Sequence, residues 1–369
     1  MADDFTFGIE EEYFLVDAQT KHVPPNVPKE FFDAAKAATD GRAATEFLQP
    51  QIEVISSPHC RIEDARAELR HLRETVAAIA AEYGLAILAA GTHPTALWRT
   101  ALQTPQERYD NVMDDLQMIG RRDLLCGMHV HVELPEPDAR IDVMRRILPY
   151  LPLFVALSTS SPFWQSWITG LKGYRLAAYN ELPRTGVPEL FRNREEFDAY
   201  VGALVRAGVI KDASYIWWAI RPSFKHPTLE LRAPDSCTLM EDSIAIAALY
   251  RTLAHYIYSH PERHADLDAV QRAIVVENKW RAQRYGVRGT FVVDGEALPV
   301  GEMLDRLIED IAADADALGC TADIERCRTI VGAGTSADAQ LAVFAANKDA
   351  GEAGALRAVS DWLAMATLQ

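Results

Sequence analysis

The chain has 369 residues, of which 49% are hydrophobic, so it can bury one large core or two ordinary ones. The net charge of −16 argues against a nucleic-acid partner and against an anionic membrane surface, because both attract basic patches. No apolar run reaches the roughly 18–20 residues of a transmembrane helix, so we expect no membrane partner.

The first half of the chain mixes strands with amphipathic helices. Alternating apolar residues predict strands over residues 4–17, 45–57, 85–90 and 124–134. Apolar residues at helical spacing predict helices over 61–83, 106–118 and 141–158. A long irregular stretch rich in glycine, proline and aromatic residues follows over 160–191. A loop of that length inside a compact domain is usually functional.

The second half is mainly helical. We predict a helix over 194–207, a pair of strands over 214–220 and 228–232, and long helices over 242–259 and 265–285. A short strand over 290–293 precedes alanine-rich helices over 301–318, 322–331, 337–346 and 354–366. Between the predicted helices over 322–331 and 337–346, the glycines at 332 and 334 are expected to stop the first helix, and Thr335 or Ser336 is expected to cap the second.

Strands that cluster between pairs of helices favour an α+β fold with a mixed or antiparallel sheet over a doubly wound parallel sheet. We find no domain boundary, so residues 1–369 are predicted to form a single domain. The all-helical end, residues 301–369, could pack as a subdomain on the same core.

The cysteines and the N-terminus predict a cytoplasmic protein. Residues 1–4 contain neither the basic region nor the apolar region of a signal peptide. The five cysteines are scattered, odd in number and free of C-x-x-C spacing, which fits a reducing compartment. They are Cys60, Cys126, Cys237, Cys320 and Cys327.

Carboxylates recur on two of the predicted strands. Side chains on a strand alternate faces, so Glu10 and Glu12 share a face of the first strand. On the second strand, Glu53 points away from its neighbours Ile52 and Val54, and Glu46 lies at its start. Solvent-exposed strands are the simpler interpretation of either segment alone. A charged residue on a buried face is costly unless it is paired or binds a metal.

Two histidines on the strand over 124–134 make the pattern more specific. His129 and His131 share one face of this strand. A pair of histidines in H-x-H spacing among valines fits two alternatives equally well: a metal site, or two core histidines whose hydrogen bonds are satisfied by the protein. Carboxylates suit Mg²⁺ or Mn²⁺, and imidazole suits Zn²⁺, Mn²⁺ or iron. Several glutamates with one or two histidines fit Mg²⁺ or Mn²⁺ better than a four-coordinate zinc site.

A further strand carries a carboxylate next to a guanidinium. Glu230 and Arg232 share one face, and the alternatives are an exposed ion pair of little worth or a metal ligand beside a phosphate-binding arginine. Two other segments supply local positive charge to this acidic protein. The loop contributes Lys172, Tyr174 and Arg175, and the helix over 265–285 contributes Asn278 and Arg281 on one face. If the protein binds ATP, we expect these five residues, together with Arg232, to contact the nucleotide. An ordinary solvated helix face is an equal alternative for the second segment.

The common nucleotide and hydrolase motifs are absent. The sequence contains no G-x-x-x-x-G-K-[ST] loop, no G-x-G-x-x-G after a strand, no H-E-x-x-H and no G-x-S-x-G. If the protein uses ATP, it does so without a P-loop or a Rossmann fold.

Taken together, these segments resemble the glutamate–cysteine ligase type 2 family, the YbdK-like carboxylate–amine ligases, which belong with glutamine synthetase and the γ-glutamylcysteine synthetases. The resemblance covers the chain from Phe7 to about Gly286. Six short motifs carry it by their order and spacing. They are Gly-Ile-Glu-Glu-Glu-Tyr (8–13), Glu46 with Glu53, Gly-Met-His-Val-His-Val (127–132), Arg-Thr-Gly-Val-Pro (184–188), Glu-Leu-Arg (230–232) and Glu-Asn-Lys-Trp-Arg-Ala-Gln-Arg-Tyr-Gly (277–286).

The resemblance implies a glutamine-synthetase-like fold, in which a curved, mostly antiparallel sheet carries helices on its outer side and binds ATP with two or three Mg²⁺ ions on its concave face. It implies the metal ligands Glu10, Glu12, Glu46, Glu53, His129 and Glu230. It places Arg232 at the γ-phosphate and gives His129 a metal or phosphate role. His131 fits the H-x-H form of the family and receives no fixed role.

The activity that the resemblance implies is ATP-dependent amide formation through an acyl phosphate, with glutamate and cysteine as first candidate substrates and weak turnover. It also implies a homodimer. Two other functions remain open from the residues alone. One is a metal-dependent hydrolase or oxygenase that uses the histidines and glutamates without ATP, and the other is a binding module in which the acidic face holds a structural cation.

Overall fold

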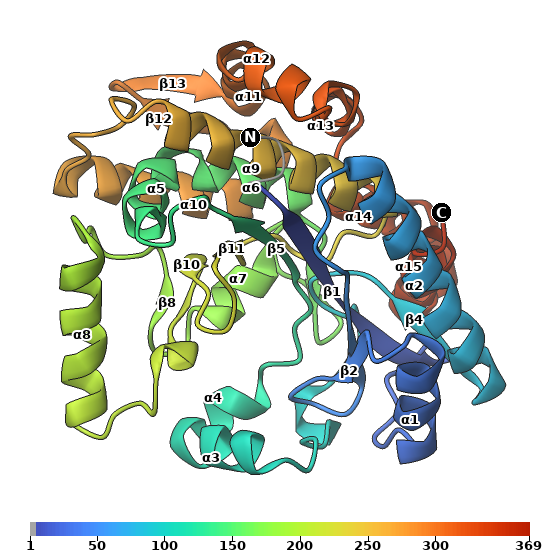
Figure 1. The fold of residues 1–369 in the computed structure, drawn as a ribbon. Helices are drawn as coiled ribbons and strands as arrows, with labels where there is room; N and C mark the ends of the chain where they lie inside the picture. The colour runs from blue at the N-terminus through green and yellow to red at the C-terminus, as the bar shows by residue number, and fades with distance from the viewer. Residues whose placement is uncertain (1–4) are drawn as a thin grey trace.

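A computed structural model describes residues 5–369 and has a seven-stranded sheet at its centre (Figure 1). The strands of this sheet are β1 (Phe7–Asp17), β2 (Ala43–Thr45), β3 (Gln51–Ile55), β4 (Leu85–Leu88), β5 (Met128–Glu133), β10 (Ile220–Pro222) and β11 (Thr228–Leu231). Their order is β10-β11-β5-β1-β3-β2, with β4 paired to the far end of β1. Every pair is antiparallel, which confirms the predicted sheet.

Fifteen helices surround this sheet within the described residues. They are α1 (Lys29–Ala38), α2 (Ile62–Glu82), α3 (Glu107–Leu116), α4 (Met118–Arg121), α5 (Ala139–Ile147), α6 (Leu151–Ser158), α7 (Tyr174–Tyr179), α8 (Arg194–Arg206), α9 (Met240–Ser259), α10 (Ala269–Tyr285), α11 (Val300–Asp310), α12 (Ala312–Ala317), α13 (Thr321–Ala333), α14 (Ser336–Ala346) and α15 (Gly351–Ala366). Helix α9 packs against β5, and α2 packs against β1 and β4. Figure 1 shows α5, α6, α9 and α10 together on one side of the sheet.

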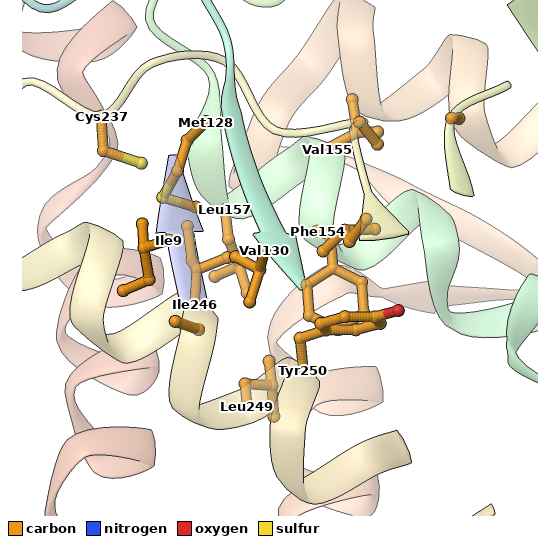
Figure 2. Packing of buried hydrophobic residues seen from close by; sticks show 14 of the residues in the cluster. Ile9, Met128, Val130, Phe154, Val155, Leu157, Cys237, Ile246, Leu249 and Tyr250 are labelled. Carbon is orange, nitrogen blue, oxygen red and sulfur yellow. The ribbon is translucent and has the colours of Figure 1, made fainter. Parts of the chain in front are cut away.

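The covered face of the sheet is apolar. Ile9 of β1 and Val130 of β5 face Ile246 and Leu249 of α9, and Leu157 of α6 closes the layer (Figure 2). Because strand side chains alternate, the residues on either side of Ile9 and Val130 must point to the opposite face. The hydrophobic packing under β1 and β5 thereby fixes the direction of the glutamates and histidines on these strands.

One charged group lies on the helix side of the sheet. Glu11 is fully buried, and the Arg73 guanidinium of α2 donates to both of its oxygens, at 2.6 Å from Nη2 and 2.8 Å from Nε. Tyr13 and Ser243 also donate to this carboxylate. Arg73 further donates to the Thr238 carbonyl at 3.0 Å. The pair therefore joins β1, α2 and the segment before α9 directly beneath Glu10 and Glu12.

Replacing Glu11 by Gln is expected to lower the free energy of unfolding by about 3 kcal/mol, because the Arg73 charge stays buried without its counter-charge. Urea unfolding of the purified variant measures this loss. The matched control is Glu30→Gln on the exposed side of α1, which should change stability by less than about 0.5 kcal/mol. A Glu11 variant as stable as that control would contradict the role of the ion pair.

Several segments differ from their predictions. The predicted helix over 141–158 is wrong as one element, because Pro149 and Pro152 interrupt the helical N–H donors and a 3₁₀ turn at Leu148–Tyr150 separates α5 from α6. The predicted strand over 45–57 is two strands, and residues 46–50 bend between them. The predicted strand over 4–17 begins at Phe7, and Asp4 lies outside the described residues.

The stretch over 160–191 contains short elements that were not predicted, namely β6 (Phe163–Trp164), β7 (Trp167–Ile168), β8 (Thr185–Gly186) and α7. Over the predicted strand at 214–220, the structure has a 3₁₀ turn, β9 (Trp217–Trp218) and the start of β10. Helix α1 was missed, and the strand over 290–293 is half of a hairpin, β12 (Thr290–Val293) with β13 (Glu296–Pro299). The predicted helix over 301–318 is α11 followed by α12.

The C-terminal helices share the main core. One cluster of buried hydrophobic residues runs from Phe5 to Leu363 and includes side chains from α11, α13 and α15. A single domain, with residues 301–369 as a helical part of it, stays a prediction that this packing supports. Gly334, at a φ of 99°, ends α13, and Thr335 caps α14 in a capping box with Asp338, as expected.

The described part of the chain holds no helix that is both long and apolar enough to cross a membrane. None of the five cysteines forms a disulfide, and Cys60 alone of them is exposed.

Candidate active site

A cavity of about 360 Å³ opens on the face of the sheet opposite α9. Its floor is formed by β1, β3, β5 and β11, and its walls by α3, by the segment between α4 and β5, and by α7. All six predicted metal ligands line it, together with Arg175 and Arg232. The six are Glu10, Glu12, Glu46, Glu53, His129 and Glu230.

Strand register brings the carboxylates of β1 next to the histidines of β5. Glu10 lies directly opposite His129, and its Oε2 is 3.2 Å from Nδ1 of that ring. The other carboxylate oxygen of Glu10 is 3.4 Å from Nε2 of His131. Burial raises the pKa of Glu10, but its interactions with the two histidines outweigh burial and hold this pKa below its ordinary value.

Glu12 occupies the next position along the same face. It lies opposite Glu53 of β3, one of its oxygens accepts the Gly127 backbone N–H at 2.6 Å, and the other is 3.6 Å from Nε2 of His129. The Nε2 atoms of His129 and His131 are both buried and make no hydrogen bond within the described residues. A buried imidazole nitrogen that has no hydrogen-bond partner and faces carboxylates can offer its lone pair to a metal ion.

Two groups of three ligands meet at one histidine. One ligand atom each from Glu10, His129 and Glu230 lie within 4.8 Å of one another, and so do ligand atoms from Glu12, Glu53 and His129. Oxygen-rich sets of this kind suit Mg²⁺ or Mn²⁺. The residues therefore fit two cations that share the His129 side of the cavity.

Glu46 and Glu53, on the β3 side of the cavity, have raised pKa values because they are buried close to other carboxylates. Burial and the nearby Glu12 charge raise the pKa of Glu46 to about 8. Burial and the charge of Glu10 raise the pKa of Glu53 well above its ordinary value. Carboxylates that repel one another in a buried site are stabilised in their charged form by a bound cation. Glu46 lines the cavity outside both groups of three, so its place as a ligand stays a prediction.

Glu230 lies between two arginines. Its Oε2 accepts a hydrogen bond from Nε of Arg221 at 2.8 Å, and its Oε1 accepts hydrogen bonds from both Arg221 and Arg232. Burial raises the pKa of Glu230, but the charges of the arginines and of His131 outweigh burial and hold it well below its ordinary range. Arg232 also approaches the Tyr179 hydroxyl at 3.4 Å from Nη2. Its guanidinium is thus held at the edge of the carboxylate cluster.

Arg175 reaches the same cavity from α7. The guanidinium donates to the backbone carbonyl of Pro234 at 3.1 Å and lies against Gly127. A Cβ atom built on Gly127 would come within 2.1 Å of the Arg175 Nη2. A side chain at position 127 would occupy the place of this guanidinium, which explains the glycine at the start of the H-x-H motif.

Four predicted nucleotide contacts do not join the cavity. Lys172 pairs with Asp338 of α14, and Tyr174 packs against Trp164. On α10, the Asn278 side chain donates to the Val292 carbonyl at 2.9 Å and accepts from the Val292 N–H at 2.7 Å. Arg281 donates to the Thr290 carbonyl and to the Thr290 hydroxyl, each at 2.6 Å. The two α10 residues hold the β12–β13 hairpin in place.

Sequence reasoning missed several residues of the cavity wall. Arg108 and Tyr109 come from α3, Asp123 precedes β5, and Arg221 comes from β10. The alternation of β10 and β11 could have indicated Arg221, since it lies opposite Glu230 in the hairpin. Arg108 and Asp123 belong to segments without a strand pattern and gave no such signal.

The comparisons with known proteins fall on one family. Residues 6–361 match the model of the glutamate-cysteine ligase family 2, GCS2. The chain belongs to this family. It is 55% identical over 365 residues to a protein of Bradyrhizobium sp. (strain ORS 278) named "Putative glutamate--cysteine ligase 2", covering 99% of this chain and 88% of that protein. A protein of the same name from Rhodospirillum rubrum is 44% identical over 92% of this chain and 89% of its own length.

Solved structures agree on the fold of this GCS2 chain. A glutamate–cysteine ligase from Francisella tularensis in complex with AMP matches with a TM-score of 0.71 at 14% identity, over 99% of this chain and 89% of its own. A bifunctional glutathione synthetase from Pasteurella multocida also gives 0.71, at 16% identity. This chain spans 53% of that longer protein. The expected ligase-type α+β fold is confirmed.

Proposed function

We propose that the chain is an ATP-dependent carboxylate–amine ligase that forms an amide bond through an acyl phosphate. The observation that carries the proposal is the meeting of two ligand groups at His129 beside the guanidinium of Arg232, all in one cavity. Membership in GCS2 and the ligase names of its relatives support it. The AMP bound to the Francisella ligase supports a nucleotide as substrate.

The reaction would take two steps. An oxygen of the substrate carboxylate attacks the γ-phosphorus of ATP, the bond to ADP breaks, and an acyl phosphate forms. The nitrogen of the amine then attacks the acyl carbon, inorganic phosphate leaves, and the nitrogen loses its excess protons. Phosphoryl transfer depends on positioning and on charge neutralisation more than on covalent help from the protein.

The residues of the cavity divide this work. Glu10, Glu12, Glu46, Glu53, His129 and Glu230 would hold two or three Mg²⁺ ions, or Mn²⁺. Bound Mg²⁺ supplies charge neutralisation on the phosphate oxygens. Arg232 would stabilise the charge of the transferring phosphoryl group, and Arg175 would bind a second phosphate oxygen.

The names of the relatives make glutamate and cysteine the first candidate substrates, and we propose weak turnover with this pair. The cavity has small-molecule dimensions, and the net charge of −16 argues against a nucleic-acid partner. A homodimer in the cytoplasm is part of the same proposal.

The test is ADP release from ATP and Mg²⁺ in the presence of pooled amino acids and other small carboxylates, with and without amines. We expect release that requires both a carboxylate and an amine. No ADP with any pool, together with a transition metal retained by the purified protein, would replace the ligase by a metal-dependent hydrolase or oxygenase acting through the same histidines.

Gly127→Ala is expected to lower the turnover of this reaction by about 10²-fold, because the new Cβ displaces Arg175 from beneath the β5 strand. Steady-state kinetics on ATP measures the effect. Gly332→Ala is the matched control, since a Cβ at Gly332 on α13 meets open space. Equal activity of the two variants would show that the position of Arg175 is unimportant.

A further inference from the structure

Among the described residues that line the cavity, Asp123 is the one carboxylate that is not a predicted metal ligand. It follows α4, three residues before the Cys126–Gly127 approach to β5, and its side chain lines the cavity. Its backbone N–H bonds the Gly120 carbonyl at 3.1 Å and thereby fixes the turn. Within residues 5–369 no hydrogen bond or ion pair involves the Asp123 carboxylate, and it belongs to neither group of metal ligands.

The groups that face Asp123 come from three elements. Glu12 faces it from β1, Arg175 and Tyr179 from α7, and Arg232 from the end of β11. Burial and then the Glu12 charge raise the pKa of Asp123 to about 7, while the two arginines pull it down. Asp123 therefore shares the space in which Arg232 would meet the transferring phosphoryl group, yet it stands apart from the cations.

The second step of the proposed reaction needs a group with these properties. An aliphatic amine is an ammonium ion at neutral pH, and an ammonium ion has no lone pair for attack on an acyl carbon. A carboxylate beside the acyl phosphate attracts the ammonium ion and can take its proton. The six carboxylate and imidazole ligands are engaged when cations are bound, which leaves Asp123 as the carboxylate of the described cavity lining that can meet the ammonium ion.

We propose that Asp123 binds the ammonium group of the amine substrate and accepts its proton before the nitrogen attacks the acyl phosphate. One N–H bond of the ammonium ion breaks, the proton passes to the Asp123 carboxylate, and the electron pair stays on nitrogen. The nitrogen lone pair then forms the C–N bond, the C–O bond to phosphate breaks, and phosphate leaves with the electrons of that C–O bond. The nitrogen loses its second proton to the departing phosphate, which gives the neutral amide. The inference rests on the proposed ligase function and assigns its amine site.

The experiment compares two nucleophiles in the wild type and in Asp123→Asn. Hydroxylamine is largely unprotonated at neutral pH and attacks acyl phosphates without a base, giving a hydroxamate that is measured by its ferric complex. With the amine substrate, Asp123→Asn should lose turnover by about 10²- to 10³-fold at pH 7, while hydroxamate formation stays within about threefold of the wild type. The Asn variant should then recover with amine by about tenfold per pH unit between pH 7 and 9, as free amine accumulates.

Two further variants separate the alternatives. Asp114→Asn on the exposed face of α3 is the matched control and should leave both reactions unchanged. Asp123→Glu keeps the carboxylate and should retain more amine-dependent turnover than Asp123→Asn does.

Each other outcome decides the matter. If Asp123→Asn loses hydroxamate and amide formation equally, or needs much more Mg²⁺, then Asp123 serves the first step or binds a cation, and the inference is wrong. Equal activity of Asp123→Asn and wild type with the amine would also overturn it. If the wild type itself forms no hydroxamate with any carboxylate pool, the ligase function fails, and the amine site fails with it.

Discussion

Glu10→Gln is expected to lower Mg²⁺-dependent ADP release by about 10³-fold while the protein stays folded. Glu10 contributes to the group formed with His129 and Glu230, and both of its oxygens approach imidazoles of β5. Gln keeps the shape and one oxygen acceptor but removes the negative charge that a divalent cation needs. The loss should therefore fall on cation binding and turnover, and not on stability.

Two measurements check this expectation. Electron paramagnetic resonance counts bound Mn²⁺ and should show weaker binding at one site in the variant, and urea unfolding should show a midpoint like that of the wild type. Glu352→Gln, on the exposed face of α15, controls for a general loss of negative charge. Turnover of Glu10→Gln at the level of this control would remove Glu10 from the site.

The face of each strand could be read from the sequence, because it depends only on alternation and on which neighbours are apolar. Ile9 and Val130 pack against α9, so Glu10 and His129 must face away from it. The register of β1 against β5 could not be read, since it depends on where two distant segments pair. That register places Glu10 opposite His129 and so creates the ligand groups.

The positive charges were harder to predict than the negative ones. A glutamate side chain is short, so the strand face on which it lies decides what it can contact. An arginine or lysine side chain is longer and can reach several different partners from the same position. Arg281 was expected at a nucleotide, but its guanidinium is taken by Thr290 in the hairpin next to α10. Arg221 was not predicted as a site residue. It lies on β10, next to the strand that carries Glu230, and its Nε donates a hydrogen bond to that carboxylate. Such choices depend on tertiary contacts that no local pattern contains.

The middle glutamate of the first motif illustrates the same limit. Glu10 and Glu12 were assigned to the site by alternation, and alternation also sends Glu11 to the opposite, covered face. Its partner Arg73 lies on a helix whose apolar periodicity gave no sign of a buried guanidinium. The motif therefore combines two functions: two carboxylates face the cavity, and one anchors the strand that carries them.

Arg232→Lys is the second change with a large expected effect, a loss in turnover of about 10²- to 10³-fold with a small change in the KM for ATP. Nη1 of Arg232 binds Glu230 while Nη2 lies 3.4 Å from the Tyr179 hydroxyl, so two edges of the guanidinium are fixed at once. The planar fork can hold Glu230 and still present N–H groups to a phosphate oxygen. A lysine ammonium ion carries the charge but cannot span both positions.

Separate kcat and KM values for ATP, and the affinity for ADP measured by calorimetry, distinguish a role in the transition state from one in ground-state binding. Arg357→Lys on α15 is the matched control, because Arg357 also pairs with a carboxylate, that of Asp361 at 3.0 Å, but on the surface. A full loss in ADP affinity with unchanged kcat would make Arg232 a binding residue for the nucleotide. A fully active Arg232→Lys would deny it any phosphate role, and the charge of the transferring phosphoryl group would then fall to Arg175 and the cations alone.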